Sequence, residues 1–71
     1  RALLKEFKEY TESTGRLRVF RSEAVRAGFA DCIKRQDYET IVMVAERLPE
    51  DVLREDPDLL MYYDSALLRK K

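Results

Sequence analysis

The clearest hydrophobic pattern in the chain lies in residues 22–48, where two amphipathic segments flank a short polar break at 35–37. In both segments apolar residues recur every three or four positions, the spacing that places side chains on one face of a helix. The pattern therefore predicts helices over about 22–36 and 38–48, folded back on each other as a hairpin. We expect the other segments to form a layer on one side of this hairpin.

The two helices of the hairpin carry capping signals. Ser22 and Asp37 can accept hydrogen bonds from the first free amides of the helices, and Pro49 ends the second helix because it has no amide proton. The run IVMV at 41–44 has the β-branched composition that is typical of a strand. We predict a helix there, because the run lies between a capping aspartate and a proline.

The first helix of the hairpin presents a ridge of large side chains beside a groove of small ones, and this arrangement lets a second helix approach closely. The ridge consists of Val25, Phe29 and Ile33, and the groove of Ala24, Gly28 and Cys32. A cysteine in this groove is expected to be packed and unreactive.

A helix is also predicted at each end of the chain. Over about 1–14 apolar residues follow helical spacing, and Gly15 is a C-terminal stop. Over about 57–70 the start is marked by the sequence DPD at 56–58, a capping acid followed by proline at the first helical position. The inward face of this last helix is expected to hold Leu59, Leu60, Tyr63, Ala66 and Leu67.

Two short segments connect these helices. Residues 16–21, RLRVFR, alternate basic and apolar side chains, which predicts either an extended connector or the first turn of the next helix. Residues 50–55 predict a single helical turn. No segment is predicted to be a strand. The predicted fold class is all-α, a small bundle of four helices with one short helical turn, forming a single domain over 1–71.

Composition and charge narrow the class of protein. The 71 residues include one cysteine, which cannot close an internal disulfide, so we expect a reducing, cytoplasmic environment. No apolar run approaches the roughly 18 residues of a membrane span, so no membrane contact is expected. The chain begins at Arg1 and not at methionine, and we expect it to be a fragment of a larger protein. Residues 1–36 carry a net charge of +4 and residues 37–71 a net charge of −4.

Residues 34–42, KRQDYETIV, resemble the hinge between the two helices of a tetratricopeptide-type repeat. Residues 46–69, ERLPEDVLREDPDLLMYYDSALLR, also resemble the helical repeats of large signal-dependent regulators. Taken over about 22–70, the resemblance implies that 22–48 form one helix pair and that 57–70 begin the next. It also admits a regulatory sensor for small molecules, a class that requires a pocket.

A second resemblance is weaker. Residues 16–29, RLRVFRSEAVRAGF, and residues 48–64, LPEDVLREDPDLLMYYD, are similar to the tail of large prokaryotic helicase-like or restriction-associated proteins. This resemblance implies a parent protein that acts on DNA.

Enzymatic chemistry is not predicted. The sequence has no histidine, glycine-rich phosphate loop, nucleophile motif or paired-cysteine spacing, so neither a cofactor nor a metal is expected. The acidic residues between 50 and 58 are explained as first-turn acids of two helices. We therefore expect a non-catalytic interaction or accessory module of a larger intracellular protein, which contacts other domains, a protein partner or a second copy of itself. The residues expected to make these contacts are Met61, Tyr62, Leu68, Glu50 and Asp51.

The alternative function is that of a nucleic-acid-contacting accessory domain in a DNA-processing protein. Guanidinium groups suit phosphate, and Phe20 nearby could stack on a base. The basic set that would contact DNA consists of Arg16, Arg18, Arg21 and Arg26. The same arginines would otherwise form a solvated surface or pair with the acidic second half of the chain.

Overall fold

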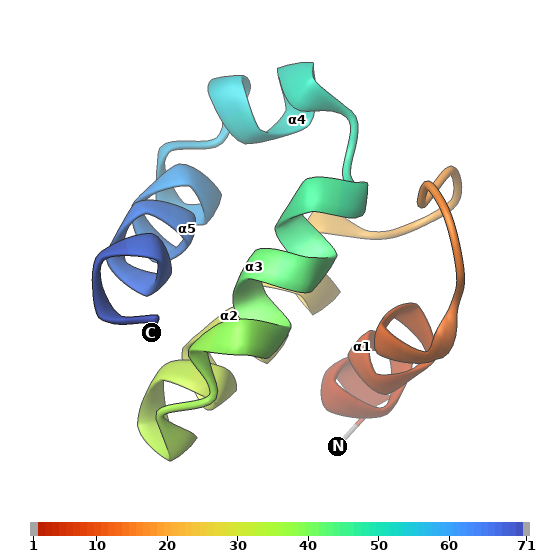
Figure 1. Cartoon of the computed structure of the whole chain (residues 1–71). Helices are drawn as coiled ribbons and strands as arrows, with labels where there is room; N and C mark the ends of the chain where they lie inside the picture. Colours follow the sequence, from red (N-terminus) through yellow and green to blue (C-terminus); the bar gives the residue numbers. More distant parts are fainter. Residues whose placement is uncertain (1, 71) are drawn as a thin grey trace.

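The computed structural model describes residues 2–70, which form five helices and the segments between them (Figure 1). No strand occurs among the described residues, so the all-α class and the small helical bundle are confirmed. Residues 1 and 71, at which the predicted domain begins and ends, lie outside the described part of the chain. The helices are α1 (Ala2–Glu12), α2 (Ser22–Arg35), α3 (Tyr38–Arg47), α4 (Glu50–Glu55) and α5 (Pro57–Arg69).

Helices α2 and α3 form the predicted hairpin, and α1 and α5 pack on opposite sides of it (Figure 1). Each of these outer helices contacts both helices of the hairpin, and the short helix α4 leads from α3 to α5. The expectation of a layer on one side only is therefore wrong. The physical reason lies in α2, whose buried side is wide enough for two neighbours, with Gly28 turned to α1 and Phe29 in contact with both α1 and α5.

The start of α2 also differs from the prediction. Its N-cap is Arg21 and not Ser22, because Arg21 has an extended backbone (φ −112°, ψ 131°) and its carbonyl accepts the amides of Ala24 and Val25, each at 3.1 Å. No side-chain hydrogen bond caps this end of the helix. At the other end Gln36 adopts the left-handed conformation (φ 59°), which ends the helix one residue earlier than predicted and begins the turn to α3.

The remaining helix boundaries near the hairpin follow the signals in the sequence. Asp37 caps α3 by accepting the amide of Thr40 at 3.3 Å. Asp56 caps α5 by accepting the first two free amides of that helix at 3.1 and 3.3 Å. The β-branched run at 41–44 is helical, as predicted, and α3 ends before Pro49.

Residues 13–21 are not helical and connect α1 to α2, so residues 16–21 form the connector, which was one of their two interpretations. Helix α1 ends at Glu12, two residues earlier than predicted, and Gly15 (φ 76°) turns the chain after it. Leu17 is buried in the core, and its amide donates to the carbonyl of Arg47 at 2.9 Å. The connector is therefore anchored to the end of α3.

The centre of the core is Phe29, whose side chain is fully buried. Its ring meets the ring of Phe7 from α1 edge-on, with the centroids 5.8 Å apart, and the ring of Tyr62 from α5 edge-on at 6.2 Å. Next to it, a Cβ atom added to Gly28 would lie only 2.1 Å from the Phe7 ring. Because Gly28 has no side chain, α1 can approach α2 this closely.

Helix α5 is rotated relative to the predicted orientation. Leu59 and Ala66 are fully buried, as expected, but Tyr62 also packs inward. The buried side is thus centred on these three residues, which lie three and four positions apart. Leu60 and Leu67, which were predicted to face inward, are displaced to the surface.

We predict that Gly28→Ala destabilises the domain by about 1–3 kcal/mol, because the added methyl group must displace the ring of Phe7. This cost opposes the higher helix propensity of alanine, which by itself would stabilise α2 by about 1 kcal/mol. Urea denaturation followed by circular dichroism measures the change. In a Phe7→Leu background the same substitution should cost less, since the smaller side chain relieves the overlap. Unchanged or increased stability of Gly28→Ala would contradict the close contact.

Candidate functional site

The exposed large apolar side chains of the described residues are concentrated on one helix. Four of the five lie on α5: Leu60 (36% exposed), Met61 (54%), Leu67 (46%) and Leu68 (87%). The fifth is Val19 in the connector, at 88%. The four residues of α5 lie on the side of the helix turned away from the core, and we call them the α5 apolar face.

Two of the residues predicted to contact a partner, Met61 and Leu68, belong to the α5 apolar face. A third, Tyr62, is half-buried and contributes its ring to the core, so it offers less surface than predicted. Leu60 and Leu67 are members of the same face that sequence reasoning missed. Their helical spacing fits the inward and the outward side of α5 almost equally well, so only the packing of the neighbouring helices separates the two arrangements.

The acidic residues predicted to contact a partner, Glu50 and Asp51, are exposed in the first turn of α4. The carboxylate of Glu50 lies 3.7 Å from the guanidinium of Arg54, one turn along the same helix. An exposed pair of this kind adds little to stability. The residues predicted as one contact set therefore fall on two helices, α4 and α5.

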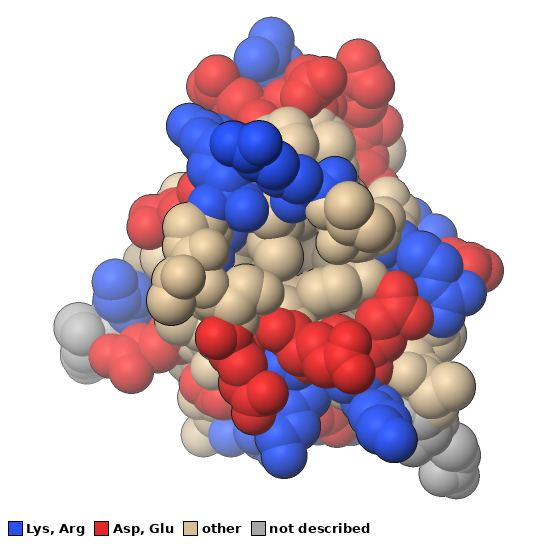
Figure 2. All heavy atoms as spheres, turned by 90° about the vertical axis from the view of Figure 1, so that its right-hand side faces the viewer, with Lys and Arg blue, Asp and Glu red and all other residues tan. Residues whose placement is uncertain are grey.

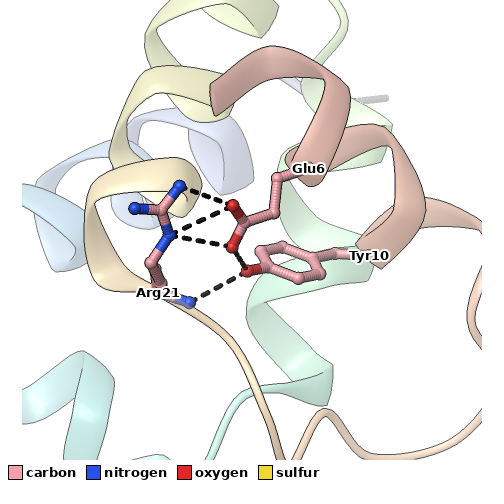
Figure 3. Close-up of polar contacts among 3 residues, drawn as sticks. All are labelled: Glu6, Tyr10 and Arg21. Carbon is pink, nitrogen blue, oxygen red and sulfur yellow. Dashed lines mark hydrogen bonds and ion pairs between the residues drawn. The ribbon is translucent and has the colours of Figure 1, made fainter. Parts of the chain in front are cut away.

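Arg21, one of the four arginines predicted to contact nucleic acid, is held by α1 (Figure 3). Its guanidinium group donates to both carboxylate oxygens of Glu6 at 2.6–3.1 Å. The hydroxyl of Tyr10 donates to the same carboxylate and accepts the backbone amide of Arg21 at 2.9 Å. The three residues form a closed network that ties α1 to the start of α2.

The pKa values in this network indicate a structural role. The hydrogen bonds from Arg21 and Tyr10 lower the pKa of Glu6, so its carboxylate is charged at neutral pH. Burial, together with the bond to Glu6, raises the pKa of the Tyr10 hydroxyl above 10.0. A phenol that is held protonated in this way is a poor base and a poor nucleophile. The network therefore fastens the end of the connector to α1.

Arg26, a second member of the basic set, is also engaged. Its guanidinium donates to the carboxylate of Asp56 at 2.7 Å, and this carboxylate caps α5 at the same time. The side chain of Asp56 therefore joins α2 to the start of α5. The pair connects the basic first half of the chain with the acidic second half.

Arg16 and Arg18 remain exposed, and neither forms an ion pair among the described residues. Phe20, which was expected to stack on a base, packs partly against the core. On this side of the molecule Lys and Arg gather above a band of Asp and Glu (Figure 2). The surface is thus mixed in charge, and two of the four predicted arginines are available to phosphate.

Cys32 is fully buried, and burial raises the pKa of its thiol to about 11. The side chain of Arg35 reaches back so that its Nη2 lies 3.6 Å from the sulfur, but this contact does not offset the burial. In residues 2–70 no group of three or more His, Cys, Asp or Glu side chains is placed to hold a metal ion. None of the helices described here is both long enough and apolar enough to cross a bilayer.

A sensor of small molecules would need a pocket, and the clearest apolar hollow lies between α1 and α2. It has a volume of about 380 Å³ and is open to solvent. Its lining includes Leu3, Leu4, Ala27 and Ala30. Two charged residues, Asp31 and Lys34, also line this hollow, and neither is fully buried.

Comparisons of the chain with protein family models, with curated proteins and with solved structures find no match. Both sequence resemblances therefore stay predictions. They are the likeness of residues 22–70 to tetratricopeptide-type repeats and the weaker likeness to helicase-like tails.

We predict that Glu6→Gln destabilises the domain at pH 7 and has a smaller effect at low pH. Because the pKa of Glu6 is lowered in the folded state, its carboxylate stabilises the fold above the ordinary value of 4.5. This contribution is lost as the pH falls through the lowered folded-state pKa. Urea denaturation of the wild type and the variant at pH 7 and at pH 3 measures it.

The matched control is Glu9→Gln, on the same helix, because Glu9 forms no ion pair among the described residues. We expect the control to stay close to the wild type at both pH values. A difference between wild type and Glu6→Gln that is the same at pH 7 and pH 3 would show that the carboxylate charge does not matter.

Proposed function

We propose that this domain is a non-catalytic interaction module of a larger cytoplasmic protein, and that the α5 apolar face docks onto another protein or another domain. The observation that carries the proposal is the concentration of exposed large apolar side chains on one side of one helix. Single exposed apolar residues are ordinary on protein surfaces, but several gathered on one side of one helix are typical of a contact site.

The physical reason is the cost of leaving this face in water. Burying apolar surface contributes about 25 cal/mol per Å², so four large side chains on adjacent turns offer a partner several kcal/mol. The helix beneath them is held firmly, because Leu59 and Ala66 are fully buried and Asp56 caps its first turn. A docking partner would therefore meet a preformed surface and would spend little free energy on ordering it.

The nucleic-acid alternative receives less support. Arg21 and Arg26 already pair with Glu6 and Asp56 within the domain, so only Arg16 and Arg18 of the basic set form no ion pair among the described residues. Few phosphate contacts mean weak binding that falls with salt concentration. This function stays a prediction, and the experiment below also tests it.

The proposal is tested by photo-crosslinking in cells that make the whole protein. A benzophenone amino acid replaces Leu68 in one version and Val19 in the other. The two positions are matched, since both side chains are apolar and almost equally exposed. We expect a discrete protein adduct, or an intramolecular crosslink to another domain, from position 68. We expect Met61→Glu, at a neighbouring exposed position, to abolish it while the circular dichroism spectrum is unchanged.

The other outcomes are equally informative. Equal crosslinking from both positions, or none from position 68, would overturn the proposal. Adducts to nucleic acid from position 19 that are lost at high salt would favour the alternative function, because Val19 lies beside Arg18 in the connector.

A further inference from the structure

A single carboxylate stands in the middle of the α5 apolar face. Asp64 follows Leu60 and Met61 by four and three residues, and it precedes Leu67 and Leu68 by three and four. Residues with these separations are neighbours on the surface of a helix. Asp64 is therefore adjacent to all four apolar residues, and it is exposed with them.

Among the residues that the structure describes, Asp64 has no ionic partner. No Lys or Arg of residues 2–70 forms an ion pair with it. Arg69, near the end of the same helix, is directed elsewhere, with its guanidinium 5.9 Å from the ring centre of Tyr38. Any partner that covers the α5 apolar face thus removes an unpaired carboxylate from water.

Burial of an unpaired carboxylate would cost several kcal/mol, enough to cancel much of the gain from the apolar side chains. A basic side chain placed opposite Asp64 removes this cost and adds a charge-assisted hydrogen bond. The surface therefore discriminates among apolar partners by charge, since one that brings a carboxylate to this point would be repelled.

A second copy of the chain is a poor occupant for the same reason. In a two-fold symmetric dimer each residue near the axis meets its own copy. An interface centred on the α5 apolar face would place Asp64 against Asp64 of the other protomer. Two carboxylates so close, in a region of reduced dielectric constant, repel each other.

We propose that the α5 apolar face binds an amphipathic helix whose apolar side chains flank a Lys or Arg, and that this basic side chain pairs with Asp64. The inference rests on the proposed function and specifies the chemistry of the partner. Asp64 is the residue that determines specificity, and the four apolar residues around it supply most of the affinity.

A charge-swap titration tests the pairing. The probes are two synthetic amphipathic helices of leucine and alanine that differ only at the centre of their apolar side, where one carries lysine and the other glutamate. Each is titrated into the isotope-labelled domain and followed by amide NMR. We expect the wild type to bind the lysine peptide about tenfold more tightly than the glutamate peptide, with shifts concentrated on α5. Asp64→Lys should reverse the preference, and it should fold normally because position 64 is exposed.

Different results would contradict the pairing of Asp64, the helical partner and the proposed function. The same peptide preference in wild type and Asp64→Lys, or binding of neither peptide, would overturn the inference. Sedimentation of the wild type as a dimer at pH 7 that Leu68→Glu dissociates would replace the helical partner with a second copy. If position 68 crosslinks in cells but the charge swap has no effect, docking stands and the pairing of Asp64 fails. If position 68 gives no crosslink, the proposed function itself fails.

Discussion

The close approach of α1 to α2 is the contact on which the rest of this structure depends. It exists because Gly28 leaves room for the ring of Phe7, which then meets Phe29 edge-on. Phe29 also meets Tyr62 edge-on, so contacts between three aromatic rings connect α1 through the hairpin to α5. Any side chain at position 28 would push α1 outward and loosen the first of these contacts.

The polar contacts hold in place the non-helical segments that lead into α2 and α5. Glu6 holds Arg21 at the start of α2, and Asp56 joins Arg26 to the start of α5. Both arginines belong to the set that suggests nucleic-acid binding in the sequence. Their structural use shows why a cluster of basic residues is weak evidence for a phosphate site, since the same guanidinium groups serve equally well as internal ties.

The orientation of α5 connects the core to the proposed function. Because Tyr62 turns inward to reach Phe29, the helix is rotated and Leu60 and Leu67 come to the surface beside Met61 and Leu68. The packing of the core therefore determines which apolar residues of α5 lie on the surface. A helix with leucines on most sides can pack in more than one orientation about its own axis, and the neighbouring helices determine which orientation is adopted.

The sequence by itself determined the all-α class, the position of each helix and most of their boundaries. These depend on signals a few residues apart, such as the capping aspartates Asp37 and Asp56 and the stop at Pro49. Only the tertiary structure decided which arginines are paired and which side of α5 is exposed. The ion pairs Glu6–Arg21 and Arg26–Asp56 span 15 and 30 residues, and no local pattern specifies contacts at such separations. They are set by the close packing of α1 and α5 against the hairpin, which a one-dimensional pattern of apolar residues does not encode.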